Sequence, residues 1–215
     1  MHTSLMTRSR TVFVGFVAVF LLLLGGSTPG WAQGQQSTQS EIRQMLEERD
    51  QEIKSILSGD KDYTKEQRAR LKELINGVLD FRAMAETALG PHWDTLSTDR
   101  REAFVDVFRD VVRAQSMSDL DVYNSKVTFD QISVQGDSAY VRTTTKYEGT
   151  TTPVEYVLQR TDDGEWLAEE IKVDNVGTAE SYARSFQNVV KQRGFAALMT
   201  SLKKKREEIA SSGSQ

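Results

Sequence analysis

The pattern of apolar positions divides the chain into helical segments at both ends and a strand segment between them. From Glu41 to Val112, apolar residues recur every three or four positions, the period of helices that bury one face. From Val127 to Val173, apolar and polar residues alternate, as in strands with one buried face. The helical period then returns. Helices, strands and helices in this order predict an α+β fold with helices packed on one face of an antiparallel sheet.

Local signals indicate where several helices begin and end. Thr64 and Gln67 have the spacing of a capping box, in which each residue bonds the backbone beside the other. Asp80 precedes a short apolar helix and suits its N-terminal cap. Gly90 follows that helix, where a C-terminal cap favours glycine.

The strand segment is predicted to form four strands. Short turns at Gly136, Gly149 and Gly164 separate them, which favours an antiparallel meander. The first strand is expected to be irregular near Asp130. The expected strands cover residues 127–134, 139–147, 154–158 and 166–173.

Residues 1–32 have the layout of a secretory signal peptide. Arg8 and Arg10 form a basic start, an apolar run covers residues 12–24, and small residues surround a cleavage site after Ala32. The run is shorter than the roughly 20 apolar residues that a membrane span needs. We therefore expect a secreted protein from which this segment is removed.

The remainder is expected to be a single α+β domain over residues 41–209. A polar, flexible leader (33–40) precedes it and a disordered tail (210–215) follows it. Loss of two signal arginines changes the net charge from −4 to −6, which argues against a nucleic-acid partner. The chain has no cysteine and therefore no disulfide.

The residues for common catalytic chemistry are scarce. Without the signal peptide, His92 is the single histidine, so neither the usual zinc site nor a Gly-x-Ser-x-Gly hydrolase site is present. Glu169 and Glu170 are adjacent in a predicted strand, so one of them points inward. That carboxylate is either a structural group satisfied by hydrogen bonds or a general base. We expect the structural role, no catalytic residue and no metal ligand.

Two further features allow two interpretations each. His92 and Trp93 either contact a ligand or belong to a loop whose Trp fills the core between two helices. The run from Lys203 to Arg206 is either a solvated helix end that suits the helix dipole or a contact for anionic lipid heads or a partner.

From Val78 to Lys205 the chain resembles the MlaC family, also called the toluene-tolerance periplasmic component. The late block departs from the family pattern, since Ala183 and Ser185 replace an expected arginine and glutamine, and Ser116 replaces a tyrosine. The matching motifs are Leu79-Asp80-Phe81-Arg82-Ala83-Met84-Ala85, Ala88-Leu89-Gly90 with Trp93, the segment from Leu96 to Asp110, Val154-Glu155-Tyr156 with Trp166, residues 174–186, and Gly194-Phe195 with Leu198.

The resemblance implies a cone-shaped, NTF2-like fold with an apolar cavity that holds phospholipid tails. It implies a monomeric periplasmic carrier without a cofactor, with bound phospholipid as cargo. The implied partners are an inner-membrane ABC transporter complex and an outer-membrane lipoprotein–porin complex, and the implied role is maintenance of outer-membrane lipid asymmetry.

The inward faces of the predicted elements supply the expected lipid contacts. Two alternatives remain: an enzyme for a small apolar ligand on a similar NTF2-like fold, with Glu170 as its base, or a ligand-free adaptor of a membrane complex. The expected lipid-binding residues are Phe81, Met84, Leu89, Trp93, Phe104, Phe108, Val111, Val141, Tyr156, Leu158, Trp166, Tyr182 and Phe186.

Overall fold

A computed structural model describes residues 30–59 and 62–212, with side chains placed for 34–59 and 62–209. Most of the predicted signal peptide, residues 1–29, lies outside the described residues. In chain order the elements are α1 (Gly30–Leu57), α2 (Lys65–Asn76), α3 (Phe81–Leu89), η1 (Gly90–Thr95), α4 (Thr98–Ser116), η2 (Asp121–Asn124), β1 (Lys126–Gln135), β2 (Ser138–Tyr147), β3 (Thr150–Arg160), β4 (Trp166–Val173), β5 (Val176–Gly177), α5 (Thr178–Arg193) and α6 (Phe195–Ser212).

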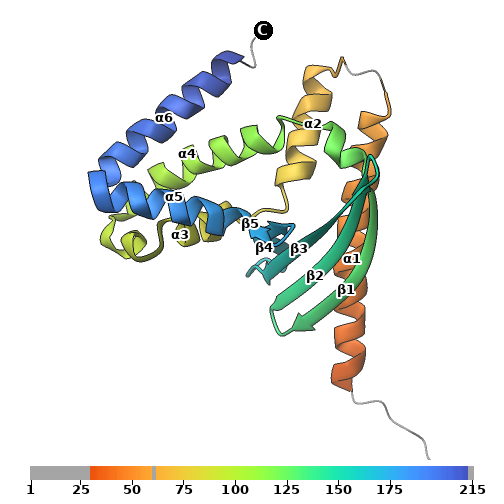
Figure 1. The fold of residues 1–215 in the computed structure, drawn as a ribbon. Coiled ribbons are helices and arrows are strands. Elements are labelled where there is room, and N and C mark those ends of the chain that lie inside the picture. Colours follow the sequence, from red (N-terminus) through yellow and green to blue (C-terminus); the bar gives the residue numbers. More distant parts are fainter. Residues whose placement is uncertain (1–29, 60–61, 213–215) are drawn as a thin grey trace, which may run out of the picture.

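The strands form one antiparallel meander in the order β1-β2-β3-β4-β5 (Figure 1). The four expected strands are confirmed, but the expected number was wrong because β5 also pairs with β4. Asp174 and Asn175 form the two-residue turn between them, with φ angles of 51° and 61°. A strand of two residues shows no alternation, so the apolar pattern did not reveal it. The expected similarity of this fold to the NTF2-like fold stays a prediction.

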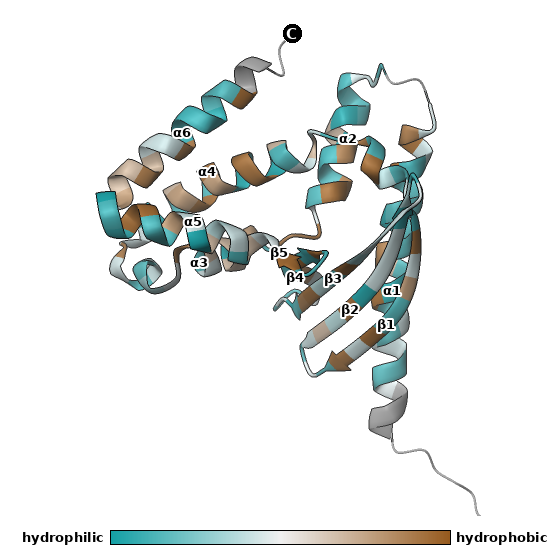
Figure 2. Cartoon of the chain, in the orientation of Figure 1, coloured by the Kyte–Doolittle hydropathy of each residue, from teal (hydrophilic) through white to brown (hydrophobic). Residues whose placement is uncertain are grey.

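The register of the sheet places one apolar face under α1. The irregularity expected near Asp130 is a β-bulge between Phe129 and Gln131. Val141 lies opposite Tyr156, and Tyr156 lies opposite Ile171. Directly opposed residues share a sheet face. The sheet is curved around α1, and Figure 2 shows hydrophobic and hydrophilic positions following one another along the strands.

The caps predicted at Thr64 and Asp80 are confirmed, whereas Ser97, which precedes α4 and was also expected to cap it, makes no side-chain cap bond. The backbone nitrogen of Gln67 donates to Thr64 Oγ1 over 3.2 Å, and the Thr64 nitrogen donates to Gln67 Oε1 over 2.8 Å. Asp80 Oδ1 accepts from the nitrogens of Arg82 and Ala83 over 3.0 and 2.9 Å. These bonds satisfy helix-terminal donors that have no partner inside the helix.

Two terminal segments differ from expectation. Residues 33–40, expected as a flexible leader, lie in α1. The hydroxyl groups of Ser37 and Thr38 donate to the carbonyl of Gly34, and that of Ser40 donates to Gln36, one turn earlier in the helix. These residues show no apolar period, so the sequence pattern did not predict that α1 begins before Glu41. At the other end, α6 continues to Ser212, into the tail expected to be disordered.

The buried apolar residues form three clusters. The helical cluster joins α3, η1, α4, α5 and α6, and includes Trp93, which fills the core between helices. The sheet cluster joins α1 to the sheet, with Ile42, Val141 and Leu158 fully buried. A third cluster joins α1 to α2. The molecule therefore has a helical layer beside a sheet layer.

Candidate functional site

The helical layer is joined to the sheet along β4. Leu79 lies beside Ala168 in a parallel bridge. The Asp80 nitrogen donates to the Ala168 carbonyl over 2.8 Å, and the Ala168 nitrogen donates to the Val78 carbonyl over 2.6 Å. Leu79 packs against both the helical cluster and the sheet cluster. This junction places the start of α3 against the last long strand.

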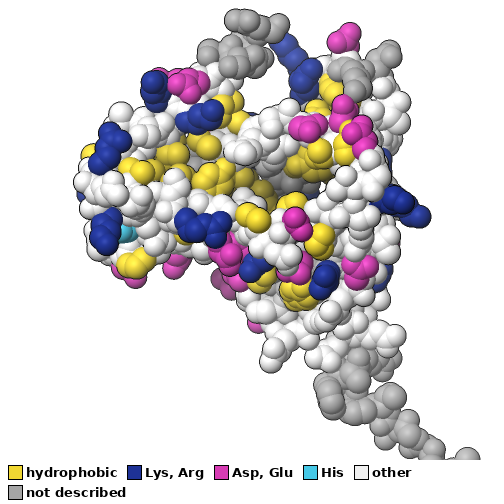
Figure 3. All heavy atoms as spheres, in the orientation of Figure 1, with side chains coloured by type: hydrophobic (Ala, Val, Ile, Leu, Met, Phe, Trp, Pro, Cys, Tyr) yellow, Lys and Arg dark blue, Asp and Glu magenta, His cyan; other side chains and the backbone are white. Residues whose placement is uncertain are grey.

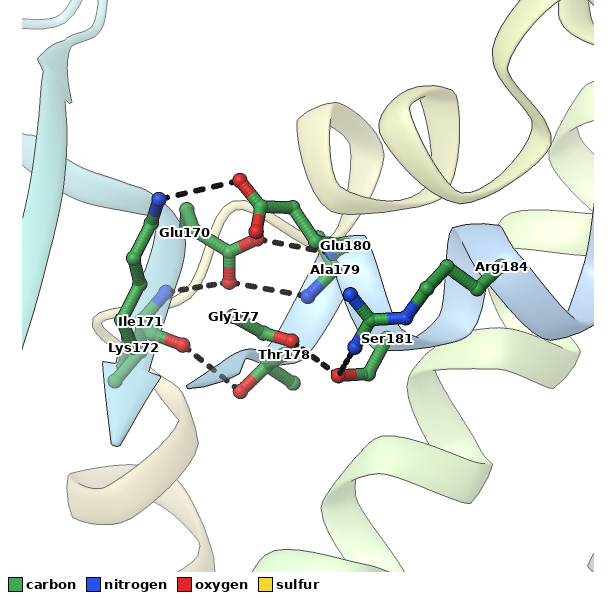
Figure 4. A network of polar contacts seen from close by, with 9 residues as sticks. All are labelled: Glu170, Ile171, Lys172, Gly177, Thr178, Ala179, Glu180, Ser181 and Arg184. Carbon is green, nitrogen blue, oxygen red and sulfur yellow. Dashed lines mark hydrogen bonds and ion pairs between the residues drawn. The ribbon is translucent and has the colours of Figure 1, made fainter. Parts of the chain in front are cut away.

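Glu170 forms a second connection at the same strand (Figure 4). Its side chain is buried, with 8% of the residue exposed. Oε1 accepts from the nitrogens of Ile171 (2.9 Å) and Ala179 (3.0 Å), and Oε2 accepts from that of Glu180 (3.0 Å). The last two donors belong to the first turn of α5, where backbone nitrogens lack partners and the helix dipole favours a negative charge. Glu170 therefore caps α5 and ties it to β4.

Neighbouring contacts complete this junction. Thr178 donates from Oγ1 to the Ile171 carbonyl over 3.0 Å, and Lys172 pairs with Glu180 over 3.2 Å. At Gly177, an added Cβ would lie 2.9 Å from Glu170 Oε2, closer than real Cβ contacts allow. The residue suspected as a general base is thus held by three backbone donors. This arrangement assigns Glu170 a structural role, as the sequence analysis favoured.

The thirteen predicted lipid-binding residues do not form one group. Six of them have no exposed surface and contact only the protein around them. Tyr156 and Tyr182 are half-buried. Nine of the thirteen belong to the helical cluster, namely Phe81, Met84, Leu89, Trp93, Phe104, Phe108, Val111, Tyr182 and Phe186. Four belong to the sheet cluster, namely Val141, Tyr156, Leu158 and Trp166.

Five half-buried apolar side chains come from the two layers and their junction, and we take them as the border of the space between the layers. They are Tyr156 and Ile171 on the sheet, Leu79 at the junction, Tyr182 on α5 and Tyr123 on η2. Figure 3 shows a hollow on this face, between α4 and the elements α1 and α2, with hydrophobic side chains on both sides. Each of these five keeps surface that the protein itself does not cover.

The tyrosines at this border are in an apolar environment. Burial raises the pKa of Tyr123 and of Tyr156 to about 12, and it also raises the pKa of Tyr182. The Tyr123 hydroxyl donates to the Ser116 carbonyl over 3.1 Å, and the Tyr182 hydroxyl lies 3.4 Å from Gln115 Oε1. Their rings thus remain available for apolar contact.

Sequence reasoning missed three residues of this border: Leu79, Tyr123 and Ile171. Alternation in sequence did not reveal Ile171, because it places this residue on the face opposite Trp166, and only the β-bulge in the pairing of β3 with β4 brings both to one face. Leu79 was visible only as one more apolar residue before Asp80. Tyr123 lies in a short 3-10 turn, which has no periodic pattern.

Two surface hollows lie elsewhere, and neither is lined by a predicted lipid-binding residue. One of about 510 Å³ runs along α1 and includes Ser37, Gln44 and Met45. The other, of about 450 Å³, lies at α3 and includes Glu86 and Glu169. Both have carboxylates in their walls, so neither is suited to binding a hydrocarbon chain.

The described residues contain no group of three or more acidic or histidine side chains arranged to hold a metal ion. Over the same residues, no helix is long and apolar enough to cross a membrane. The sequence model described as MlaC protein matches residues 39–204. The chain belongs to the MlaC family. No curated protein matches it.

A solved structure shares the fold of this MlaC family chain. It is the phospholipid-binding protein from Ralstonia solanacearum, determined in complex with a phospholipid. The two chains are 19% identical, with a TM-score of 0.65 over 80% of this chain and 98% of the other. At this identity, the match shows that both chains have the same fold.

The structure explains one departure from the MlaC pattern. At position 116, where the resemblance led us to expect a tyrosine, Ser116 donates from Oγ to Asn76 Oδ1 over 2.8 Å. Asn76 is buried and in turn donates to the Lys72 carbonyl over 3.0 Å. Tyr123 reaches the same place from η2 and bonds the Ser116 backbone.

Proposed function

We propose that this MlaC family protein is a periplasmic phospholipid carrier. The acyl chains of the bound phospholipid lie between the sheet and the helical layer. The main supporting observation is the incomplete sheet cluster, in which six residues are buried and eight are only partly buried. Tyr156 and Ile171 stand at its border toward the helices. An acyl chain between the layers would cover the exposed part of Leu79, Tyr156 and Ile171. The other five partly buried residues lie on α1 and β1.

The energetics favour such a carrier. A diacyl phospholipid exposes about 30 methylene groups, and burial of each is worth about 0.8 kcal/mol. A protein that covers these groups in water needs an apolar space with an open side for the charged headgroup, and it needs no reactive group. The capping role of Glu170 agrees with this requirement.

The wider role follows from the family resemblance and the predicted signal peptide. We propose that the protein, exported to the periplasm and monomeric, exchanges phospholipid with an inner-membrane ABC transporter complex and an outer-membrane lipoprotein–porin complex. In this role it would help to maintain outer-membrane lipid asymmetry.

Extraction of the purified protein with organic solvent, followed by mass spectrometry, tests this function. The proposal predicts close to one phospholipid molecule per protein. Repeated absence of phospholipid from protein purified without detergent would contradict it and would favour the ligand-free adaptor.

A pair of substitutions tests the location of the lipid. Ile171→Arg places a charge at the half-buried border, and we expect it to lower lipid loading more than tenfold, because a charge resists transfer beside hydrocarbon. Tyr140→Arg is the control, since Tyr140 is also half-buried but lies on the opposite face of the sheet. Arginine at Val141 or Leu158 is less informative, because both side chains are fully buried and the protein would unfold.

A further inference from the structure

Basic residues are concentrated near the C-terminal end of the sequence. Residues 181–206, which cover most of α5 and two thirds of α6, contain seven lysine and arginine residues and no aspartate or glutamate. The whole chain has a net charge of −4. With Glu180, Glu207 and Glu208 included, α5 and α6 together carry seven basic and three acidic residues, so a pair of helices with a net charge of +4 belongs to an acidic protein. Figure 3 shows several dark blue side chains along the rim of the molecule that α5 and α6 form.

The basic surface consists of Lys191, Arg193, Lys203, Lys204 and Lys205, all of them exposed. Lys204 lies 3.9 Å from Glu208. The other four form no ion pair with the described part of the protein. Positive charges that are not neutralised within the chain are available to an external partner.

The helix dipole does not account for the three lysines of α6. The sequence suggested that they stand at the end of a helix, where the dipole favours positive charge. The structure contradicts this, because α6 continues to Ser212 and its last turn contains no basic residue. Lys203, Lys204 and Lys205 lie in the middle of the helix. In α5, by contrast, Lys191 and Arg193 do occupy the last turn.

The composition of this surface fits a lipid bilayer better than a protein. Protein interfaces favour arginine and aromatic residues at an apolar centre and are depleted in lysine. Four of the five basic residues here are lysines. Among the described residues, the large hydrophobic side chains that are exposed are Val122, Val173 and Val176, and none of them lies on α5 or α6. Flexible point charges without an apolar centre suit the diffuse field of anionic headgroups.

We propose that the basic surface of α5 and α6 docks the protein on anionic lipid membranes. The attraction is electrostatic and reversible, and it orients a protein that is acidic overall so that its basic helices face the bilayer. Docking does not require that the protein carry lipid. Membrane docking can therefore fail while lipid carriage holds, and lipid carriage can fail while docking holds.

Cosedimentation with vesicles tests the proposal. We expect the purified protein to bind vesicles that contain phosphatidylglycerol, and not pure phosphatidylcholine vesicles, at about 0.02 M salt, with most binding lost at about 0.3 M. Each basic residue near such a surface contributes about fivefold to the binding constant. The variant K191Q/R193Q/K203Q/K204Q/K205Q should thus lose on the order of a hundredfold or more.

A matched control carries five neutralised charges elsewhere. It is K65Q/K72Q/K126Q/R142Q/K146Q, which changes exposed residues of α2 and the sheet and gives the same net charge. We expect it to lose less than about threefold. Equal loss in both variants, binding that ignores vesicle charge, or no binding of the parent protein would each overturn the proposal. Thermal unfolding and lipid content of both variants, measured in parallel, show whether folding and cargo are retained.

Discussion

The helical cluster and the sheet cluster differ in how completely they are buried. The helical cluster has eighteen buried residues and five that are partly buried. Its rings contact one another closely, with centroids 5.7 Å apart for Phe104 and Phe108 and 5.2 Å apart for Phe108 and Tyr182. The sheet cluster has six buried residues and eight partly buried ones. We infer that the helical layer is a closed core, whereas the sheet layer is a core that a ligand completes.

The largest loss of stability is expected from a cavity in the closed core. Phe108→Ala should lower the free energy of unfolding by about 3–5 kcal/mol, because the emptied site is enclosed on all sides. Urea unfolding of protein freed of lipid measures this change. Ile171→Ala is the comparison in the sheet cluster and should cost about 1–2 kcal/mol, since its side chain is only half-buried. Equal costs would mean that both clusters are closed.

A smaller loss is expected where the two layers are joined. Glu170→Ala removes the acceptor of three backbone donors and should cost about 2–4 kcal/mol, while Glu170→Gln keeps one acceptor oxygen and should cost less. Glu169→Ala is the control, because the Glu169 carboxylate is next in sequence, is half-buried and makes none of these bonds. Lipid binding that persists in Glu170→Gln would agree with a structural role. Unchanged stability in Glu170→Ala would contradict the cap.

Gly177 tests the same junction with a smaller perturbation. Gly177→Ala places a Cβ within 3 Å of the Glu170 and Glu180 carboxylates, and it should cost about 1–3 kcal/mol in thermal unfolding. Gly34→Ala is the control, since a Cβ there meets nothing within 4 Å and alanine favours a helix. It should leave stability unchanged or slightly higher.

Sequence alone predicts the elements better than their arrangement around a site. The alternation of residues 139–147 gave the strand and its buried face, and Asp80 gave a helix start, because both depend on neighbours in the chain. The division of the apolar residues between two clusters depends on how β4 joins the layers. Phe108 and Tyr156 carry the same apolar signal in sequence, yet one is enclosed and the other borders a space.

The smallest expected effect concerns pH. The pKa of Tyr123 and of Tyr156 is about 12 in the folded protein, against about 10 in an unfolded chain. A raised folded pKa favours the protonated form, so this contribution is complete below pH 10 and is lost as the pH rises toward 12. Tyr156→Phe should reduce the loss of unfolding free energy between about pH 10 and pH 12 by less than about 2 kcal/mol.

Tyrosinate absorbance during an alkaline titration checks the assignment. Of the six tyrosines in the chain, these two should ionise after the other four, and Tyr156→Phe should remove one of these late transitions. Ionisation of all six at ordinary values would place Tyr156 in contact with water and would weaken the apolar border.

Photo-cross-linking of a bound phospholipid tests the central claim most directly. A phospholipid with a photoreactive group at the end of one acyl chain is loaded, activated by light, and its attachment sites are mapped by mass spectrometry. The account predicts labels on the border between the layers, at Leu79, Tyr156, Ile171 or Tyr182. Labels confined to the outer surface of the sheet, such as Tyr140, or to the hollow along α1 would contradict it.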